Sequence, residues 1–211
     1  MANTNAPFGL RLLQRQIDAT PSFSLGMDPL KIAQDDATQI AKGDVLKRVT
    51  SGFVTAFTGA IGATAATGRD LAAGVFWGTQ YLSISQGKRT VSPFWPGGAD
   101  TVVDADCQYL PLTGYPNARF VAQTTLTSAA FADIGLTVDI AYAAPTIYGS
   151  WAKSNVTIDM ATAATANPGF PFRIVGLWSQ YQRANGQPGT DNASNYNWVV
   201  VEFNGSNEAG I

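Results

Sequence analysis

Short apolar runs separated by turn-forming residues recur along the chain from Ser22 onward. Runs rich in Val, Ile, Thr, Phe and Trp that end at Gly, Pro, Asn or Asp are typical of β-strands. No stretch has the periodicity of a long amphipathic helix. We expect strands at 22–27, 44–57, 74–83, 89–94, 102–110, 119–125, 137–142, 156–160, 172–181 and 198–203. The sequence therefore predicts an all-β fold, either a jelly-roll-like sandwich or two small β-barrels.

The alternation is clearest at residues 156–160, where it places Val156, Ile158 and Met160 on one face of a sheet. Two segments do not fit the strand pattern. Residues 59–68 are small and glycine-punctuated, and residues 179–197 carry Asn-Gly and Pro-Gly pairs. Both are predicted to be loops.

Residues 1–19 begin polar and continue through an apolar stretch with no capping signal and no turn that pairs it to a neighbouring strand. We interpret this segment as an extended N-terminal arm; a first strand or short helix of the same domain fits the pattern equally well. An exposed arm that carries Phe8, Leu10 and Leu13 needs a partner to bury those side chains. The Pro-Gly-Gly stretch after Trp95 suggests β subdomains at 20–97 and 98–211, or a simple turn inside one domain.

Charged residues make up 13% of the 211-residue chain, about half of the roughly 25% usual in soluble domains, and histidine is absent. A surface of Thr, Ser, Asn, Gln, Gly and Ala is easily desolvated, which suits a subunit of an assembly. Without histidine, the Ser-His-Asp, Cys-His and His-metal arrangements are excluded, so an enzyme is not expected. A net charge of −2 offers no basic field for nucleic acid, and no signal peptide or membrane span is evident.

Acidic residues and the single cysteine are the remaining candidates for chemistry. Asp104 and Asp106 lack the glycine and distal glutamate of a calcium loop, so we interpret them as solvated turn residues, and we expect no metal and no cofactor. Cys107 is interpreted as a small buried hydrophobe. The aromatic residues fit a core or a subunit interface better than a carbohydrate-binding platform.

Four short motifs occur in order along the chain: Ala6–Arg11 (APFGLR), Val91–Pro96 (VSPFWP), Ala132–Gly135 (ADIG) and Phe172–Leu177 (FRIVGL). In this the chain resembles the head decoration, or cement, proteins of tailed bacteriophages, whose N-termini read like APFGLRPV. Leu12 and Leu13 stand where that family usually has Pro-Val, and the loop at 179–197 looks longer than usual.

The resemblance implies a virion structural protein with no catalytic residues, made in the bacterial cytoplasm and bound to the outer surface of the head. Its partners would be the major capsid protein and other copies of itself, as a trimer rather than a dimer, with neither nucleic acid nor membrane involved. A tail or baseplate component and a host-carbohydrate-binding module are the alternatives. The residues expected at a capsid or subunit interface are Pro7, Phe8, Leu10, Arg11, Leu13, Phe94 and Trp95.

Overall fold

The computed structural model describes residues 2–15, 30–49, 51–58, 72–111, 118–165, 169–181 and 187–204. Its strands are β1 (Arg11–Arg15), β2 (Leu30–Ile32), β3 (Ile40–Ala41), β4 (Val45–Arg48), β5 (Val54–Ala56), β6 (Ala72–Ser83), β7 (Lys88–Ser92), β8 (Phe94–Trp95), β9 (Ala105–Pro111), β10 (Ala118–Gln123), β11 (Thr137–Ala141), β12 (Thr146–Tyr148), β13 (Trp151–Lys153), β14 (Thr157–Ala164), β15 (Phe172–Leu177) and β16 (Trp198–Phe203). The described helices are α1 (Trp178–Tyr181) and the 3-10 turns η1 (Gly98–Asp100) and η2 (Phe131–Asp133). The predicted all-β class is confirmed.

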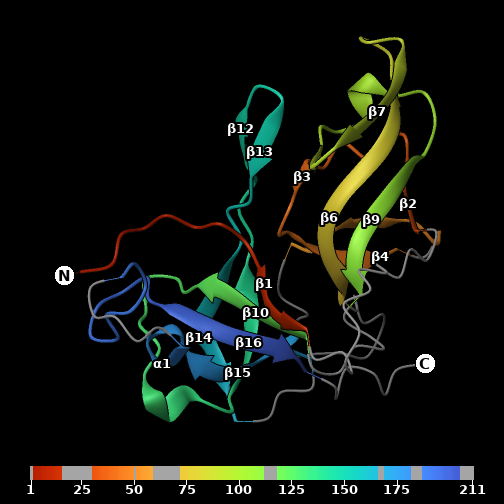
Figure 1. Ribbon diagram of the computed structural model, residues 1–211. Coiled ribbons are helices and arrows are strands. Elements are labelled where there is room, and N and C mark those ends of the chain that lie inside the picture. Colours follow the sequence, from red (N-terminus) through yellow and green to blue (C-terminus); the bar gives the residue numbers. More distant parts are fainter. Residues whose placement is uncertain are drawn as a thin grey trace.

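Two antiparallel sheets dominate the molecule, and each is named here after a central strand (Figure 1). The β6 sheet has the order β2-β9-β6-β4-β5, and β7 pairs with the far half of β6. The β16 sheet has the order β1-β10-β16-β15-β11-β14. Both sheets curl: β2 contacts β5 in the first, and a parallel bridge joins Thr124 to Ile158 of β14 in the second.

The two sheets share a hydrophobic core because alternate residues of the β6 sheet point to opposite sides. In β6, Val75 packs into the core that the sheets share, whereas the next residue, Phe76, packs into a second core on the other side of the β6 sheet. Phe120 of β10 lies fully buried in the shared core. Val156, Ile158 and Met160 are buried there too, so the predicted face of that strand is confirmed.

The chain starts in the β16 sheet with β1, then forms the β6 sheet from β2 to β9, and returns to the β16 sheet at β10. The boundary that the Pro-Gly-Gly stretch suggested at 97–98 falls inside the β6 sheet, because β9 pairs with β6 across it. In the structure that stretch is a turn that leads into η1.

Most expected strands appear at or near their predicted positions, and 198–203 coincides with β16. The run 44–57 is instead the hairpin β4–β5, because Gly52 adopts a positive φ of 86° and reverses the chain. The run 172–181 ends at Leu177, where α1 begins. The expected strand 22–27 and the loop 59–68 lie outside the described residues. Short strands such as β2, β3, β12 and β13 were not predicted, because two or three residues carry too little pattern.

Candidate functional site

The N-terminal segment is bound to the chain's own β16 sheet. Residues 11–15 form β1, which pairs with β10, so this part of the expected arm is the strand that the sequence left as an alternative. Phe8 is buried and meets Trp198 edge to face at 4.7 Å, and Leu10 lies in the shared core. The polar residues before Phe8 are also bound to the chain. The backbone amide of Ala6 donates to the Gln123 side chain, and the backbone amide of Asn3 donates to the Ser194 hydroxyl. Phe8 and Leu10 therefore find their partners within the chain.

Phe94 and Trp95, expected at an interface, are also interior residues. Trp95 has no exposed surface, its indole N–H donates to the Asp36 carbonyl (3.1 Å), and Tyr81 meets its ring edge to face at 5.6 Å. Phe94 packs in a small buried cluster with Ala41 and Ala152. Of the expected interface residues, Arg11 is exposed, and Pro7 and Leu13 are half-buried.

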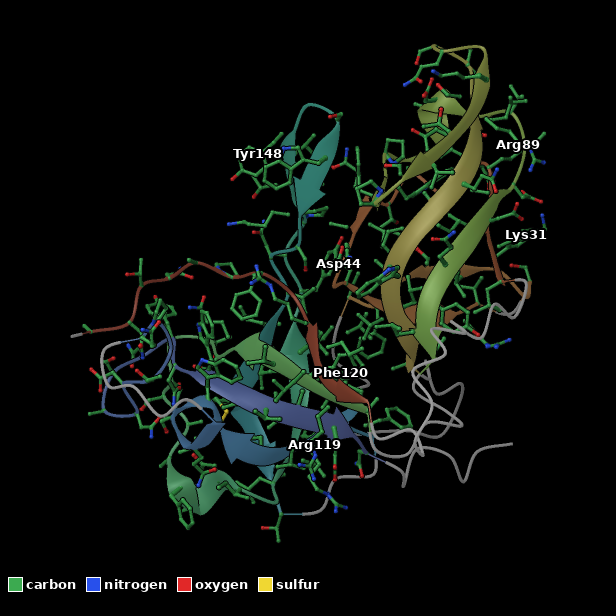
Figure 2. The ribbon with its side chains drawn as sticks, viewed as in Figure 1. Lys31, Asp44, Arg89, Arg119, Phe120 and Tyr148 are labelled. Carbon is green, nitrogen blue, oxygen red and sulfur yellow. The ribbon has the colours of Figure 1, made fainter. Side chains whose placement is uncertain are left out.

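Four segments far apart in the sequence meet at one junction between the sheets. The Leu10 amide donates to the Gly43 carbonyl (2.9 Å), and the Gly43 amide donates to the Phe76 carbonyl (3.0 Å). The Ser154 hydroxyl, just after β13, donates to the buried Asp44 carboxylate, which also accepts the Ala41 amide (2.7 Å). Figure 2 shows Asp44 between the base of the β12–β13 hairpin and the β6 sheet. Burial raises the pKa of Asp44 to about 6 despite these hydrogen bonds.

Gly9 makes this junction possible, and we expect Gly9→Ala to lower the free energy of unfolding by about 1–3 kcal/mol. Gly9 has a φ of 71°, and an added Cβ would lie 2.8 Å from the Gly43 carbonyl oxygen and closer still to the Ser154 hydroxyl. Urea unfolding followed by circular dichroism measures the loss. Gly149→Ala is the control, because it shares the positive φ (63°) but has nothing within 4 Å of the added Cβ. Equal losses in the two variants would contradict the steric explanation.

Beside this junction lies a groove of about 450 Å³, which we call the cationic groove. It is lined by Phe8, Leu10, Arg11, Leu12, Lys42, Trp77, Trp151, Ala152, Lys153 and Ser154. The Lys42 ammonium lies 3.4 Å from the centre of the Trp77 ring, and the Arg11 guanidinium lies 4.3 Å from that of Phe8. Partial burial lowers the pKa of Lys42. The groove thus combines positive charge with aromatic and aliphatic walls.

The β12–β13 hairpin forms one wall of this groove and projects away from the β16 sheet (Figure 1). Near its tip, Tyr148 and Trp151 are stacked, with ring centres 4.4 Å apart and planes 17° apart. About half of each side chain is exposed, 47% and 49%. This pair was not predicted from the sequence, although the Gly149-Ser150 step between the two aromatic residues is a two-residue hairpin signal that could have indicated it.

The far end of the β6 sheet carries exposed apolar side chains, which we call the β6–β7 patch: Leu82, Ile84, Val91, Val102 and Val103. Val91 lies opposite Gln80 on the paired strand, so it shares a sheet face with Leu82. Asp100 ties η1 to the end of β6, since the Ser83 hydroxyl (2.6 Å) and the Ser85 amide (2.8 Å) donate to its carboxylate. These hydrogen bonds hold the pKa of Asp100 below its ordinary value.

Further exposed apolar side chains are Phe131 of η2, which is 71% exposed, and Leu126 a few residues before it, which is 66% exposed. Figure 1 places η2, the green coil at the lower left, at the opposite end of the molecule from β7 at the upper right.

The other sequence candidates have structural roles. The Gln34 amide donates to Asp104 (3.0 Å), and Asp106 pairs with Lys31 at 3.1 Å across β2 and β9. Cys107 is buried as expected, and burial raises the pKa of its thiol to about 12. No group of three potential metal ligands occurs among the residues that the structure describes.

No family model, curated protein or solved structure matches this chain. Within the described ranges, no helix has the length and apolar character required to cross a membrane.

Proposed function

We propose that this chain is a structural protein of a tailed-bacteriophage virion, which decorates the outside of the icosahedral head and stabilises it by bridging major capsid subunits. The four sequence motifs support this proposal, and so does a surface poor in charge. In this proposal the chain acts by adding interface area and does no chemistry.

The observation that carries the proposal is the presence of exposed apolar side chains at opposite ends of one all-β molecule. The β6–β7 patch lies at one end, and Leu126 with Phe131 lies at the other. In this proposal both sets of side chains are buried against the head, since exposed apolar patches mark sites of protein contact. A bridge between two neighbouring subunits requires two such sites far enough apart to engage both. Repetition over the lattice then multiplies a modest contact energy.

The apolar side chains of the arm are part of the fold of the chain itself. Since Phe8 and Leu10 are buried in the chain itself, deletion of the arm would remove β1 and part of the shared core. Surface substitutions therefore test head binding more cleanly than truncation does.

The test is co-sedimentation of the purified protein with phage heads that lack it, followed by heating of the loaded heads. We expect the wild-type protein to bind and to raise the temperature at which heads disrupt. Val91→Ser with Val102→Ser removes two exposed apolar side chains, worth about 2 kcal/mol if both are buried on binding, or roughly thirtyfold in Kd. Ala99→Ser, an exposed change in neighbouring η1, is the control and should bind as the wild type does.

Three outcomes separate the candidates. Binding that depends on Val91 and Val102 and stabilises heads supports the decoration role. Binding to isolated tails but not to heads would assign the protein to the tail or baseplate. A tryptophan fluorescence shift with host polysaccharide, in the absence of head binding, would favour the carbohydrate-binding module.

A further inference from the structure

We propose that the cationic groove binds an extended acidic segment of a neighbouring head subunit, with carboxylates on Arg11, Lys42 and Lys153 and apolar side chains against Trp77 and Trp151. This inference rests on the proposed function and names the chemistry of one contact that the function requires. It concerns a different surface from the β6–β7 patch, and so it is tested separately.

Charge is the first argument. Three cations line one groove in a chain whose net charge is −2. Lys31 pairs with Asp106 outside the groove, and Arg11, Lys42 and Lys153 have no described carboxylate within 4 Å. Asp44, the carboxylate at the junction, is buried and already accepts the hydrogen bonds of Ser154 and Ala41. The positive charge of the groove is therefore left for a partner.

The cations are also held in place before any partner arrives. Lys42 rests on the face of Trp77 and Arg11 on the face of Phe8, which restricts two long side chains. Arranged in advance, they lose less conformational entropy when they meet a carboxylate, and this loss is a main cost of binding. A carboxylate should therefore bind more tightly to these restrained cations than to cations on mobile side chains.

The lining distinguishes a peptide from a sugar. Its polar side chains are donors: Arg11, Lys42 and Lys153, together with Ser154, whose hydroxyl already donates to Asp44 and accepts the Val156 amide. Among the described residues, no carboxylate or amide side chain lines the groove. Sugar hydroxyls both donate and accept, and they would find no free side-chain acceptor here. A carboxylate only accepts hydrogen bonds, which suits these donors. An apolar residue next to it in the bound segment would cover Leu12 and the indole rings of Trp77 and Trp151.

The shape fits an extended segment. The groove has a volume of about 450 Å³, which lies within the range of small-ligand sites. A folded domain is too large to enter a groove of this volume. The groove lies between β1, an end strand of the six-stranded β16 sheet, and β13 of the two-stranded β12–β13 hairpin. End strands are where an extended chain binds proteins most readily.

The test uses a double variant that carries both Lys42→Gln and Lys153→Gln. Its co-sedimentation with heads is compared with that of the wild type at low and at high salt. Each lost carboxylate contact should raise Kd about tenfold, and the salt dependence of Kd should become shallower. The control is Arg48→Gln with Arg173→Gln, which removes two exposed cations outside the groove and changes the net charge equally. We expect the control to bind within about twofold of the wild type. Thermal unfolding confirms that each variant folds.

The outcomes distinguish this inference from the proposed function. If the wild type binds heads and the groove variant binds equally well, the groove inference is wrong and the decoration role stands. If the wild type does not bind heads, both are wrong. Binding to polygalacturonate that is lost in the groove variant, with head binding unchanged, would assign the groove to an acidic glycan and overturn the peptide assignment.

Discussion

Replacing Trp95 by alanine is expected to lower the free energy of unfolding by about 3–5 kcal/mol. Its side chain is the largest that is fully buried, and it fills the core behind the β6 sheet beside Tyr81. The substitution removes this packing and the hydrogen bond from the indole to the Asp36 carbonyl (3.1 Å). The remaining atoms can close the cavity only in part. Urea unfolding, followed by circular dichroism and by near-ultraviolet signals, measures the loss.

Trp151→Ala is the matched control for this prediction. Trp151 is 49% exposed on the β12–β13 hairpin, so its removal should cost less than about 1 kcal/mol of folding stability. If Trp95→Ala left stability unchanged and abolished binding to heads, Trp95 would be an interface residue, as its motif suggested. A large loss in Trp95→Ala and a small one in Trp151→Ala would confirm that burial separates the two residues.

The second large effect concerns pH. Burial raises the pKa of Asp44 from its ordinary 3.8 to about 6, so the folded protein holds a proton on this carboxyl that the unfolded chain releases. The stability that this proton supplies is complete below pH 3.8 and is lost as the pH rises through about 6. At about 1.36 kcal/mol per pKa unit, the contribution amounts to about 3 kcal/mol.

Asp44→Asn removes the titrating group, and we expect the difference in unfolding free energy between wild type and variant to change by about 3 kcal/mol from pH 3.5 to pH 7.5. The wild type should lose stability relative to the variant as the pH rises. Chemical denaturation at a series of pH values provides the measurement. A constant difference over this range would show that Asp44 titrates alike in the folded and unfolded chain.

Ser154→Ala is a companion variant with a different expected signature. The Ser154 hydroxyl donates to Asp44 and stabilises its charged form, so its removal should raise the pKa of Asp44 further. The pH dependence should then persist and extend above pH 6. This result would also show that the base of the hairpin and the β6 sheet are coupled through one hydrogen bond.

The junction around Asp44 and Gly9 positions the cationic groove. Leu10, Ser154 and their neighbours hold β1 and the β12–β13 hairpin at fixed places beside the turn that carries Lys42. Loss of this junction should therefore change the geometry of the groove more than that of the β6–β7 patch. The Kd of Gly9→Ala for heads, compared with the Kd values of the groove variant and of the patch variant, tests this expectation.

Local sequence patterns were enough to predict the all-β class and most of the long strands, because alternation and turn residues are local signals. The run at 198–203 became β16, and Val156, Ile158 and Met160 share a buried face as predicted. Cys107 was likewise identified as buried, since its small apolar side chain fits the interior of β9.

The candidate site was decided by tertiary structure. Phe8, Leu10, Phe94 and Trp95 are apolar in any arrangement, and their place in the interior follows only from the pairing of β1 with β10 and of β3 with β8. The cationic groove unites Arg11, Lys42, Trp77 and Lys153 from four separate segments. No local pattern connects residues so far apart in the chain, because long-range strand pairing is set by the packing of the whole core.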